Sequence, residues 1–260
     1  MTKEKISIVK IGGNIIEDEN ALKQFLQLFS KLAGKKILIH GGGKRATQFA
    51  SKLGIASKMI DGRRITDKET LEVITMVYAG LVNKKIVAQL QALQTNAIGL
   101  TGADINTIQS EKRPVKEIDF GFVGDVKHVN HHGIDTLMTA GFTPVFCALT
   151  HDGNGQLLNT NADTIASQVA IGMSKIYTTT LYYCFELKGV LNDFEDKESV
   201  IQKIDSKTYK ELLHTGTISA GMLPKLENCF DALQMGVAEV RIGNTSLFSE
   251  ENNLFTSIAL

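Results

Sequence analysis

Apolar residues along this chain follow two alternating periodicities. Short β-branched runs at 6–10 and 36–39 have the length of buried strands, and apolar residues recur at helical spacing from Ala21 to Leu32 between them. Similar patterns predict strands at 143–147, 176–179 and 238–242, and helices at 44–53, after Asn161, at 206–214 and at 223–235. This alternation predicts an α/β fold in which helices cover both faces of a mainly parallel sheet.

The longest predicted helix begins near Asp67. Thr66 is the candidate N-cap, and Glu69 follows three residues later, which is the pattern of a capping box. The apolar face expected for this helix contains Leu71, Ile74, Val77, Tyr78, Leu81 and Ile86. We therefore expect these six side chains to face the core.

The region 107–129 interrupts the alternation of strand and helix. Pro114, Gly121 and Gly124 separate short β-prone pieces, which predicts a hairpin-rich excursion from the main sheet. No Pro-rich or Ser-rich linker divides the chain, and we place a soft boundary near Met173. The expected organisation is two closely joined lobes, 1–173 and 174–260.

Composition narrows the classes of function. With 260 residues, 43% of them hydrophobic, the chain has enough apolar side chains for one large domain or two fused lobes. Lys+Arg and Asp+Glu both number 28, so no charge excess indicates nucleic acid as a partner. No apolar stretch reaches the ~18 residues of a membrane span. Three cysteines without a CxxC pair and no signal-like apolar run predict a cytoplasmic protein.

Two predicted strands run directly into glycines. The stretches are VKIGGN, which contains Lys10, and HGGGK, which begins at His40. Glycine lets backbone amides approach an anion closely, and Lys10 adds a positive charge, so both are candidate phosphate or carboxylate sites. Neither is a GxxxxGK(S/T) or a GxGxxG motif. The alternatives are a plain turn with a solvent-facing Lys10 and, for His40, a buried strand end, which we favour over a catalytic base.

Three later motifs carry further polar candidates. DGRRITD places Arg64 before the long helix, where a guanidinium binds a carboxylate through two parallel hydrogen bonds; a solvated basic turn is the alternative. LNTNAD places Asn159 just outside a helix that Asn161 is expected to cap, with Asp163 in its first turn. In SAGMLPK, Lys225 lies in the first turn of a helix, where the helix dipole disfavours a cation and hints at a bound anion.

Together and in this order, the motifs resemble the amino acid kinase family. The matched pieces, which span Val9 to Lys225, are VKIGGN, HGGGK, DGRRITD, AGLVNKKIV, GFVGDV, GQLLNTNAD and SAGMLPK. The resemblance implies an αβα sandwich on a mainly parallel sheet of roughly eight strands. It also implies that 1–173 binds an acyl amino acid and forms a homodimer along the long helix, and that 174–260 binds ATP with Mg²⁺.

Within the family, the chain is most similar to members that phosphorylate an N-acylated glutamate. The resemblance implies transfer of the γ-phosphoryl group of ATP to the side-chain carboxylate of N-acetyl-L-glutamate in arginine biosynthesis. It implies catalytic roles for Lys10, Lys225 and Asp163, substrate binding by Gly42, Gly43, Arg64 and Asn159, and phosphate binding by Gly12 and Gly13. No metal site built from side chains is expected, since the six histidines show no ligand spacing.

The nucleotide segment departs from the family pattern. Where the family has Leu-Thr/Ser-Asp-Val-x-Gly, residues 183–189 read YCFELKG, so the nucleotide contacts are expected from Glu186, Lys188 and Gly189. Glu186 keeps the acid of the pattern but lengthens it by one methylene group.

Other readings of the sequence stay open beside this one. The substrate can be N-succinyl-L-glutamate, whose extra carboxylate has Lys112, Arg113 and Lys116 nearby in the sequence. A catalytically silent regulator with the kinase fold is disfavoured because Lys10 and Lys225 are both retained. A dinucleotide-binding oxidoreductase is disfavoured because GxGxxG is missing.

Overall fold

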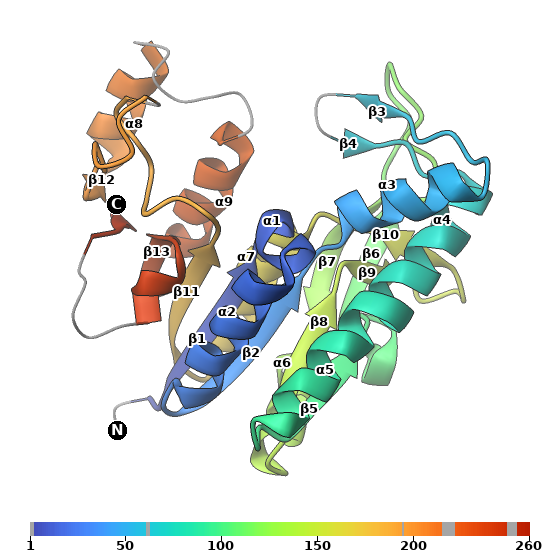
Figure 1. Ribbon diagram of the computed structural model, residues 1–260, viewed down its shortest axis with the longest axis horizontal. Coiled ribbons are helices and arrows are strands. Elements are labelled where there is room, and N and C mark those ends of the chain that lie inside the picture. The colour runs from blue at the N-terminus through green and yellow to red at the C-terminus, as the bar shows by residue number, and fades with distance from the viewer. Residues whose placement is uncertain (1–2, 61–62, 194, 215–221, 249–253) are drawn as a thin grey trace.

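A large central sheet organises the molecule (Figure 1). The computed structural model describes residues 3–60, 63–193, 195–214, 222–248 and 254–260, and in these ranges the sheet has eight strands in the order β12-β14-β13-β11-β1-β2-β8-β5. Its strands are β1 Lys5–Ile11, β2 Lys35–His40, β5 Ala97–Leu100, β8 Thr143–Cys147, β11 Thr178–Cys184, β12 Lys203–Ile204, β13 Glu239–Gly243 and β14 Thr256–Ile258. Neighbouring strands are parallel except for β13 and β14. The predicted mainly parallel eight-stranded sheet is confirmed.

Helices cover both faces of this sheet, so the predicted αβα sandwich is confirmed (Figure 1). One face carries α2 and α5, and the other carries α6, α7 and α9. The helices of the two layers and their connections are α1 Gly13–Glu17, α2 Glu19–Lys31, α3 Gly43–Lys52, α4 Lys68–Ile74, α5 Asn83–Ala92, α6 His131–Thr139, α7 Ala162–Ser174, α8 Ser206–His214 and α9 Leu223–Gln234. Three other helical segments are η1 Thr75–Val82, η2 Asp104–Asn106 and η3 Thr245–Phe248.

Strand β1 lies at the centre of the sheet and aligns the strand ends that matter for the site. Its apolar side chains are buried, as expected for a strand covered on both faces. Ile11 is in register with His40 of β2 on one side and with Cys184 of β11 on the other. The carboxyl ends of these three parallel strands therefore meet at one edge, where open α/β sheets bind ligands.

A second, smaller sheet lies beside the first. It has the order β10-β9-β6-β7, with β6 Ile108–Lys112, β7 Gly124–Val129, β9 Leu149–His151 and β10 Leu157–Asn159. Because β6 and β7 are antiparallel, the predicted hairpin in 107–129 is confirmed. A two-stranded sheet of β3 Met59–Ile60 and β4 Arg63–Arg64 stands at its side. The division of the chain near Met173 stays a prediction, because β1 hydrogen-bonds to strands from both expected lobes.

The long helix forms as predicted, but its start differs. It runs through α4, η1 and α5. The N-cap is Asp67, whose carboxylate accepts a hydrogen bond of 2.8 Å from the backbone N–H of Thr70. The prediction of Thr66 as the cap is wrong, because Thr66 lies one residue too early and its hydroxyl donates to the carbonyl oxygen of Arg64 instead.

The middle of this helix, η1, is a π-helix. The N–H of Asn83 bonds to the carbonyl oxygen of Tyr78, five residues back, as well as to Gly80. This wider turn changes which side chains face the core. Leu81, predicted to be buried, is 43% exposed, whereas Val82 is buried at 5%. The α-helical spacing used in the prediction does not apply in this segment.

In the ranges that the structure describes, every helix is too short or too polar to cross a lipid bilayer.

His40 is the buried strand end that the sequence favoured. It is fully buried, and its Nδ1 lies 2.7 Å from the carbonyl oxygen of Gly41, to which it donates. The side-chain amide of Asn83 donates to Nε2 at 3.0 Å and to the carbonyl oxygen of Val145 at 2.9 Å. Burial lowers the pKa of His40 to about 4, from an ordinary value of 6.5.

This burial predicts a specific acid sensitivity of the fold. Between pH 4 and pH 6.5 the unfolded chain binds a proton at His40 that the folded chain excludes. The free energy of unfolding is therefore highest above pH 6.5 and falls as the pH drops from 6.5 towards 4. Each unit of pKa difference corresponds to ~1.4 kcal/mol, so we expect the free energy of unfolding to fall by about 3 kcal/mol between pH 6.5 and pH 4. Urea unfolding at a series of pH values should show this loss, and His40→Gln should remove most of its pH dependence. The exposed His128→Gln is the control, and an unchanged pH dependence in His40→Gln would contradict the assignment.

Candidate active site

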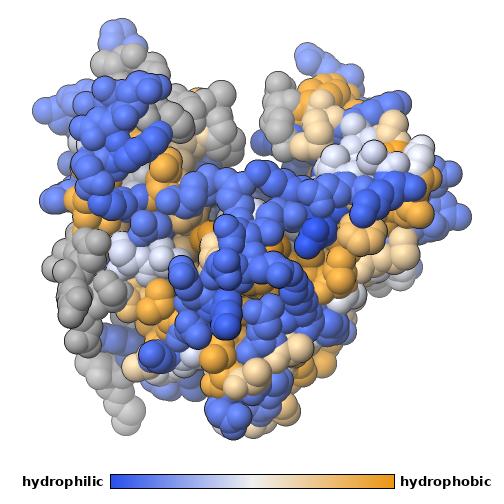
Figure 2. Space-filling view, viewed as in Figure 1, coloured by the Kyte–Doolittle hydropathy of each residue, from blue (hydrophilic) through white to orange (hydrophobic). Residues whose placement is uncertain are grey.

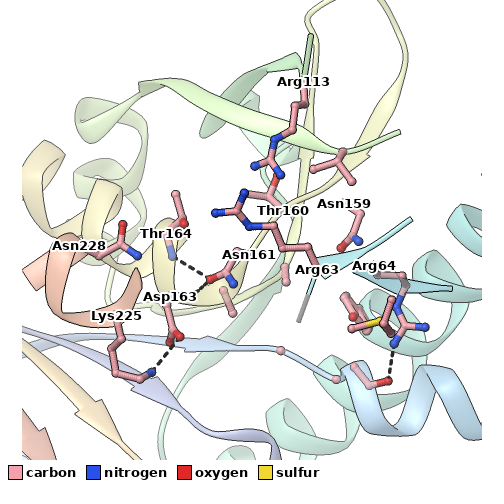
Figure 3. Close-up of a pocket in the computed structure, with 18 of the residues that line it drawn as sticks. Arg63, Arg64, Arg113, Asn159, Thr160, Asn161, Asp163, Thr164, Lys225 and Asn228 are labelled. Atoms are coloured by element: carbon pink, nitrogen blue, oxygen red, sulfur yellow. Dashed lines mark hydrogen bonds and ion pairs between the residues drawn. The ribbon is translucent and has the colours of Figure 1, made fainter. Parts of the chain in front are cut away.

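Two lysines converge on one carboxylate at the carboxyl edge of the sheet. Asp163 lies in the first turn of α7, which Asn161 caps by accepting hydrogen bonds from the backbone N–H groups of Asp163 and Thr164 at 2.7 and 3.2 Å. The Nζ atom of Lys10, from β1, lies 2.7 Å from one oxygen of Asp163. The Nζ atom of Lys225, from the first turn of α9, lies 2.8 Å from the other (Figure 3). The predicted cap by Asn161 is confirmed.

The electrostatics of this cluster follow from its partial burial. The side chains of Lys10, Asp163 and Lys225 are only 13%, 20% and 14% exposed. Burial works against the ionised form of Asp163, but the two lysine charges outweigh it and hold its pKa well below the usual range. Burial also lowers the pKa of Lys10, and the attraction of Asp163 opposes this effect. Two cations and one anion leave a net positive charge, which suits an anionic ligand.

Tyr183 contacts both Asp163 and Lys225 of this cluster. It lies in β11, in register with Lys10, and its hydroxyl donates a hydrogen bond of 3.0 Å to the backbone carbonyl oxygen of Asp163. The Nζ atom of Lys225 lies 4.9 Å from the centroid of the Tyr183 ring, within the range of a cation–π interaction. One tyrosine therefore fixes the start of α7 and also contacts one of the lysines.

A cavity of about 550 Å³ opens beside this cluster. It lies between the β3–β4 hairpin and α9, where Figure 2 shows the molecule hollowed between its two upper parts. The predicted residues that line it are Gly42, Gly43, Arg64, Asn159, Asp163 and Lys225. Six of the residues singled out in the sequence, from five different elements or their ends, thus line one cavity. Lys10 does not line the cavity itself but forms an ion pair with Asp163, which does.

Arg64 is held rigidly on the hairpin side of the cavity. Its Nη1 donates to the hydroxyl of Ser57 at 2.8 Å. Its Nη2 donates to the carbonyl oxygen of Gly43 at 3.0 Å and to the hydroxyl of Thr47 at 2.8 Å (Figure 3). On the same side, the amide of Asn159 donates to the hydroxyl of Thr66 at 3.0 Å. Both side chains are therefore partly committed to the protein.

The other predicted site residues lie outside this cavity. The N–H of Gly12 donates to the carbonyl oxygen of Cys184 at 2.8 Å, and Gly13 begins α1. Glu186 lines a smaller cavity of about 310 Å³, where it accepts a hydrogen bond of 2.6 Å from Asn14. Their assignment to phosphate and nucleotide binding stays a prediction.

Lys188 and Gly189 have structural partners. The Nζ atom of Lys188 pairs with Glu198 at 2.5 Å. A Cβ atom on Gly189 would lie 2.6 Å from the hydroxyl oxygen of Thr256, so this position requires glycine for packing. Parts of two predicted motifs, Asp61 and Gly62 of DGRRITD and 219–221 of SAGMLPK, lie outside the described residues.

Several cavity residues were not predicted as functional. Tyr78 was assigned only to the apolar face of the long helix, although tyrosine combines an apolar ring with a polar hydroxyl. Arg63, Asn228 and Asp231 also line the cavity. The sequence signal for Asn228 was its spacing of three residues from Lys225, which places it on the same side of α9.

A model of the amino acid kinase family matches residues 5–244. The chain belongs to the amino acid kinase family.

Relatives in this family share most of the chain. A protein named acetylglutamate kinase from Cytophaga hutchinsonii is 57% identical over 240 residues, which cover 92% of this chain and 91% of that protein. Another of the same name, from Phocaeicola vulgatus, is 55% identical over 248 residues and covers 95% and 96% of the two chains. The resemblance read from the ordered motifs is confirmed.

Solved structures of related fold agree with the family. The structure of smu.665 from Streptococcus mutans is 26% identical in sequence to this chain and superposes with a TM-score of 0.78. The match covers 98% of each of the two chains. N-acetylglutamate synthase from Neisseria gonorrhoeae, 19% identical with a TM-score of 0.83, matches all of this chain and 60% of its own. The second likeness shows the fold alone.

The cluster predicts how stability responds to loss of Asp163. In Asp163→Asn, two lysine charges face each other without an anion, and removal of one partner of such a partly buried network costs about 2 kcal/mol. The melting temperature should fall at low ionic strength and recover partly in salt, because salt screens the repulsion. Thermal melts across a salt series measure both effects. Glu198→Gln, which breaks an exposed pair with Lys188, is the control; an equal response of both variants would refute the prediction.

Proposed function

We propose that this chain is an acetylglutamate kinase, which transfers the γ-phosphoryl group of ATP to the side-chain carboxylate of N-acetyl-L-glutamate in arginine biosynthesis. The observation that carries the proposal is the pair Lys10 and Lys225 on one aspartate, at the rim of a cavity that also holds Gly42, Gly43 and Arg64. The names of relatives at more than half identity support the same substrate.

The proposed chemistry needs charge neutralisation more than proton transfer. The acceptor carboxylate is ionised at neutral pH, so no general base is required. One of its oxygens attacks the γ-phosphorus in line, the bond to the bridging oxygen of ADP breaks, and the products are an acyl phosphate and ADP. Lys10 and Lys225 stabilise the charge on the transferring group, and Asp163 holds the two lysines in position.

The two ends of the acyl substrate have different partners in this proposal. The reacting carboxylate lies towards Lys10 and Lys225, and the α-carboxylate lies towards Arg64 on the opposite wall. Asn159 and the backbone of Gly42 and Gly43 complete the substrate contacts. Lobe 1–173 thus binds the acyl amino acid, and lobe 174–260 binds ATP.

The Mg²⁺ ion expected with ATP fits a site without dedicated protein ligands. In the described part of the chain, no group of three or more His, Cys, Asp or Glu side chains is placed to hold a metal. Both oxygens of Asp163 are engaged by lysines. An ion held mainly by triphosphate oxygens and water matches this donor set and would neutralise phosphate charge.

N-Succinyl-L-glutamate is the second candidate substrate, on the strength of two additional cations at the cavity. Arg63 and Arg113 line it beyond Arg64 (Figure 3). Arg113 already forms hydrogen bonds of 2.6 to 3.2 Å with Asp125, which offsets its charge. Arg63 is exposed, and its side chain pairs with no acid among the described residues, so its charge would suit the succinyl carboxylate.

The roles of the two lysines predict the outcome of a kinetic test. Lys10→Ala and Lys225→Ala should each lower kcat by ~100-fold or more, because each removes a charge that acts on the transition state. A coupled ADP-release assay with saturating ATP measures this effect, with N-acetyl- and N-succinyl-L-glutamate as parallel acceptors. The acceptor with the higher kcat/KM identifies the acyl group.

Controls separate catalysis from folding in this test. Lys85→Ala, in α5, removes a lysine that pairs with the exposed Glu19 away from the cavity and should keep normal turnover. Thermal melts of all variants show whether the fold is retained. Near-normal kcat in both active-site variants would overturn the mechanism, and no ADP release by the unmodified protein with either acceptor would favour a silent regulator.

We also propose a homodimer formed along the long helix. On this helix Met76 is 57% exposed and Leu81 is 43% exposed, and strand β5 beside it is an edge strand of the main sheet. Exposed apolar side chains next to an unpaired strand edge are typical of an interface. The resemblance to the family implies the same surface.

The exposed helix surface predicts how the dimer can be broken. Light scattering should give the mass of a dimer for the unmodified protein, and Leu81→Asp together with Met76→Asp should give a monomer, because the buried apolar contact is replaced by two charges. Leu213→Asp, on α8 and 42% exposed in the monomer, is the matched control. A monomer without substitution, or a dimer that survives both, would exclude this interface.

A further inference from the structure

Tyr78 is a residue of the cavity wall whose role the proposed chemistry leaves unexplained. It lies in η1 and is only 5% exposed, yet it lines the same cavity as Arg64 and Asn159. Its ring packs on Gly42 so closely that a Cβ atom there would lie 2.8 Å from Cδ1. The ring is therefore fixed between the π-helix and the glycine loop.

The hydroxyl of Tyr78 and the guanidinium of Arg64 meet beside Gly43. A Cβ atom on Gly43 would lie 3.7 Å from the tyrosine hydroxyl and 3.9 Å from Nη2 of Arg64. Burial raises the pKa of Tyr78, while the charge and hydrogen bonding of Arg64 act against this rise. The phenol thus keeps its proton at neutral pH, and its O–H group can donate a hydrogen bond to a ligand.

Part of the hydrogen-bonding capacity of Arg64 is already used within the protein. A guanidinium has five N–H groups, and both of its two-bond arrangements use a hydrogen of Nη2. Nη2 already donates to the carbonyl oxygen of Gly43 and the hydroxyl of Thr47, and Nη1 donates to the hydroxyl of Ser57. Arg64 thus offers its charge while several of its donors are occupied, so a second donor beside it would strengthen the binding of a carboxylate.

We propose that the hydroxyl of Tyr78 is this second donor, so that Tyr78 and Arg64 together bind the α-carboxylate of the acyl amino acid. This inference rests on the proposed function and deepens it. Arg64 supplies the positive charge and Tyr78 supplies a directed hydrogen bond from a side chain with only two torsions to fix. The pair therefore selects acceptors that carry a carboxylate at the α-carbon over acceptors that lack one.

The test compares two acceptors in two forms of the enzyme. Tyr78→Phe removes only the hydroxyl and keeps the ring against Gly42. The acceptors are N-acetyl-L-glutamate and 4-acetamidobutanoate, which lacks the α-carboxylate but keeps the carboxylate that is phosphorylated. Tyr78→Phe should raise the KM for N-acetyl-L-glutamate about tenfold, the usual effect of one hydrogen bond to a charged group, with kcat within about twofold. The KM for 4-acetamidobutanoate and for ATP should stay unchanged.

The outcomes separate this inference from the function on which it rests. An unchanged KM for N-acetyl-L-glutamate, or an equal rise for both acceptors, overturns the role of Tyr78 and leaves the kinase activity standing. If the unmodified protein neither releases ADP with N-acetyl-L-glutamate nor binds it in calorimetry, the proposed function falls and this inference falls with it. Tyr209→Phe, on α8 outside the cavity, is the matched control. Because both acceptors are measured on one preparation, the ratio of their kcat/KM values is independent of the folded fraction.

Discussion

The site depends on one aspartate that keeps two lysines together. Lys10 comes from the central strand and Lys225 from a helix that follows more than two hundred residues later, and nothing but Asp163 bridges their charges among the contacts described. The helix that carries Asp163 is itself fixed by the cap of Asn161 and by the hydroxyl of Tyr183. The cavity therefore has a preformed cationic end, whose geometry does not have to be assembled when an anion arrives.

The opposite wall of the cavity follows a different principle. Arg64 is surrounded by acceptors from the protein itself, so its position is fixed but its donors are largely occupied. A charge held in this way provides attraction with limited directionality. Neighbours with fixed orientation can supply the missing directionality, and Asn159 and Tyr78 both line the cavity.

The layers of the fold were predictable because buried parallel strands are short β-branched runs, as in β1 and β2. Strand β11 was placed too early, because its second half, LYYC, lacks β-branched residues; β12 and β14 are too short to leave a periodic signal. The cap by Asn161 was readable from local chemistry. The convergence of Lys10, Asp163 and Lys225 was not, since it is a tertiary contact, and only the resemblance to a family indicated it. The commitments of Arg64 and the hydroxyl of Tyr78 escaped both approaches, because they depend on which neighbours the fold supplies.

The π-helix has a consequence for how the chain can vary in length. A π-helical turn holds more residues than the α-helical turn that could replace it. Loss of one residue inside η1 would let the helix close in α-helical form while α4 and α5 keep the faces they now present. The same loss inside α5 would rotate every later residue of that helix by ~100° relative to the sheet. We therefore expect relatives that are one residue shorter in this helix to lack a residue within 75–82. A deletion there leaves α5 in place, so that Asn83 stays beside His40.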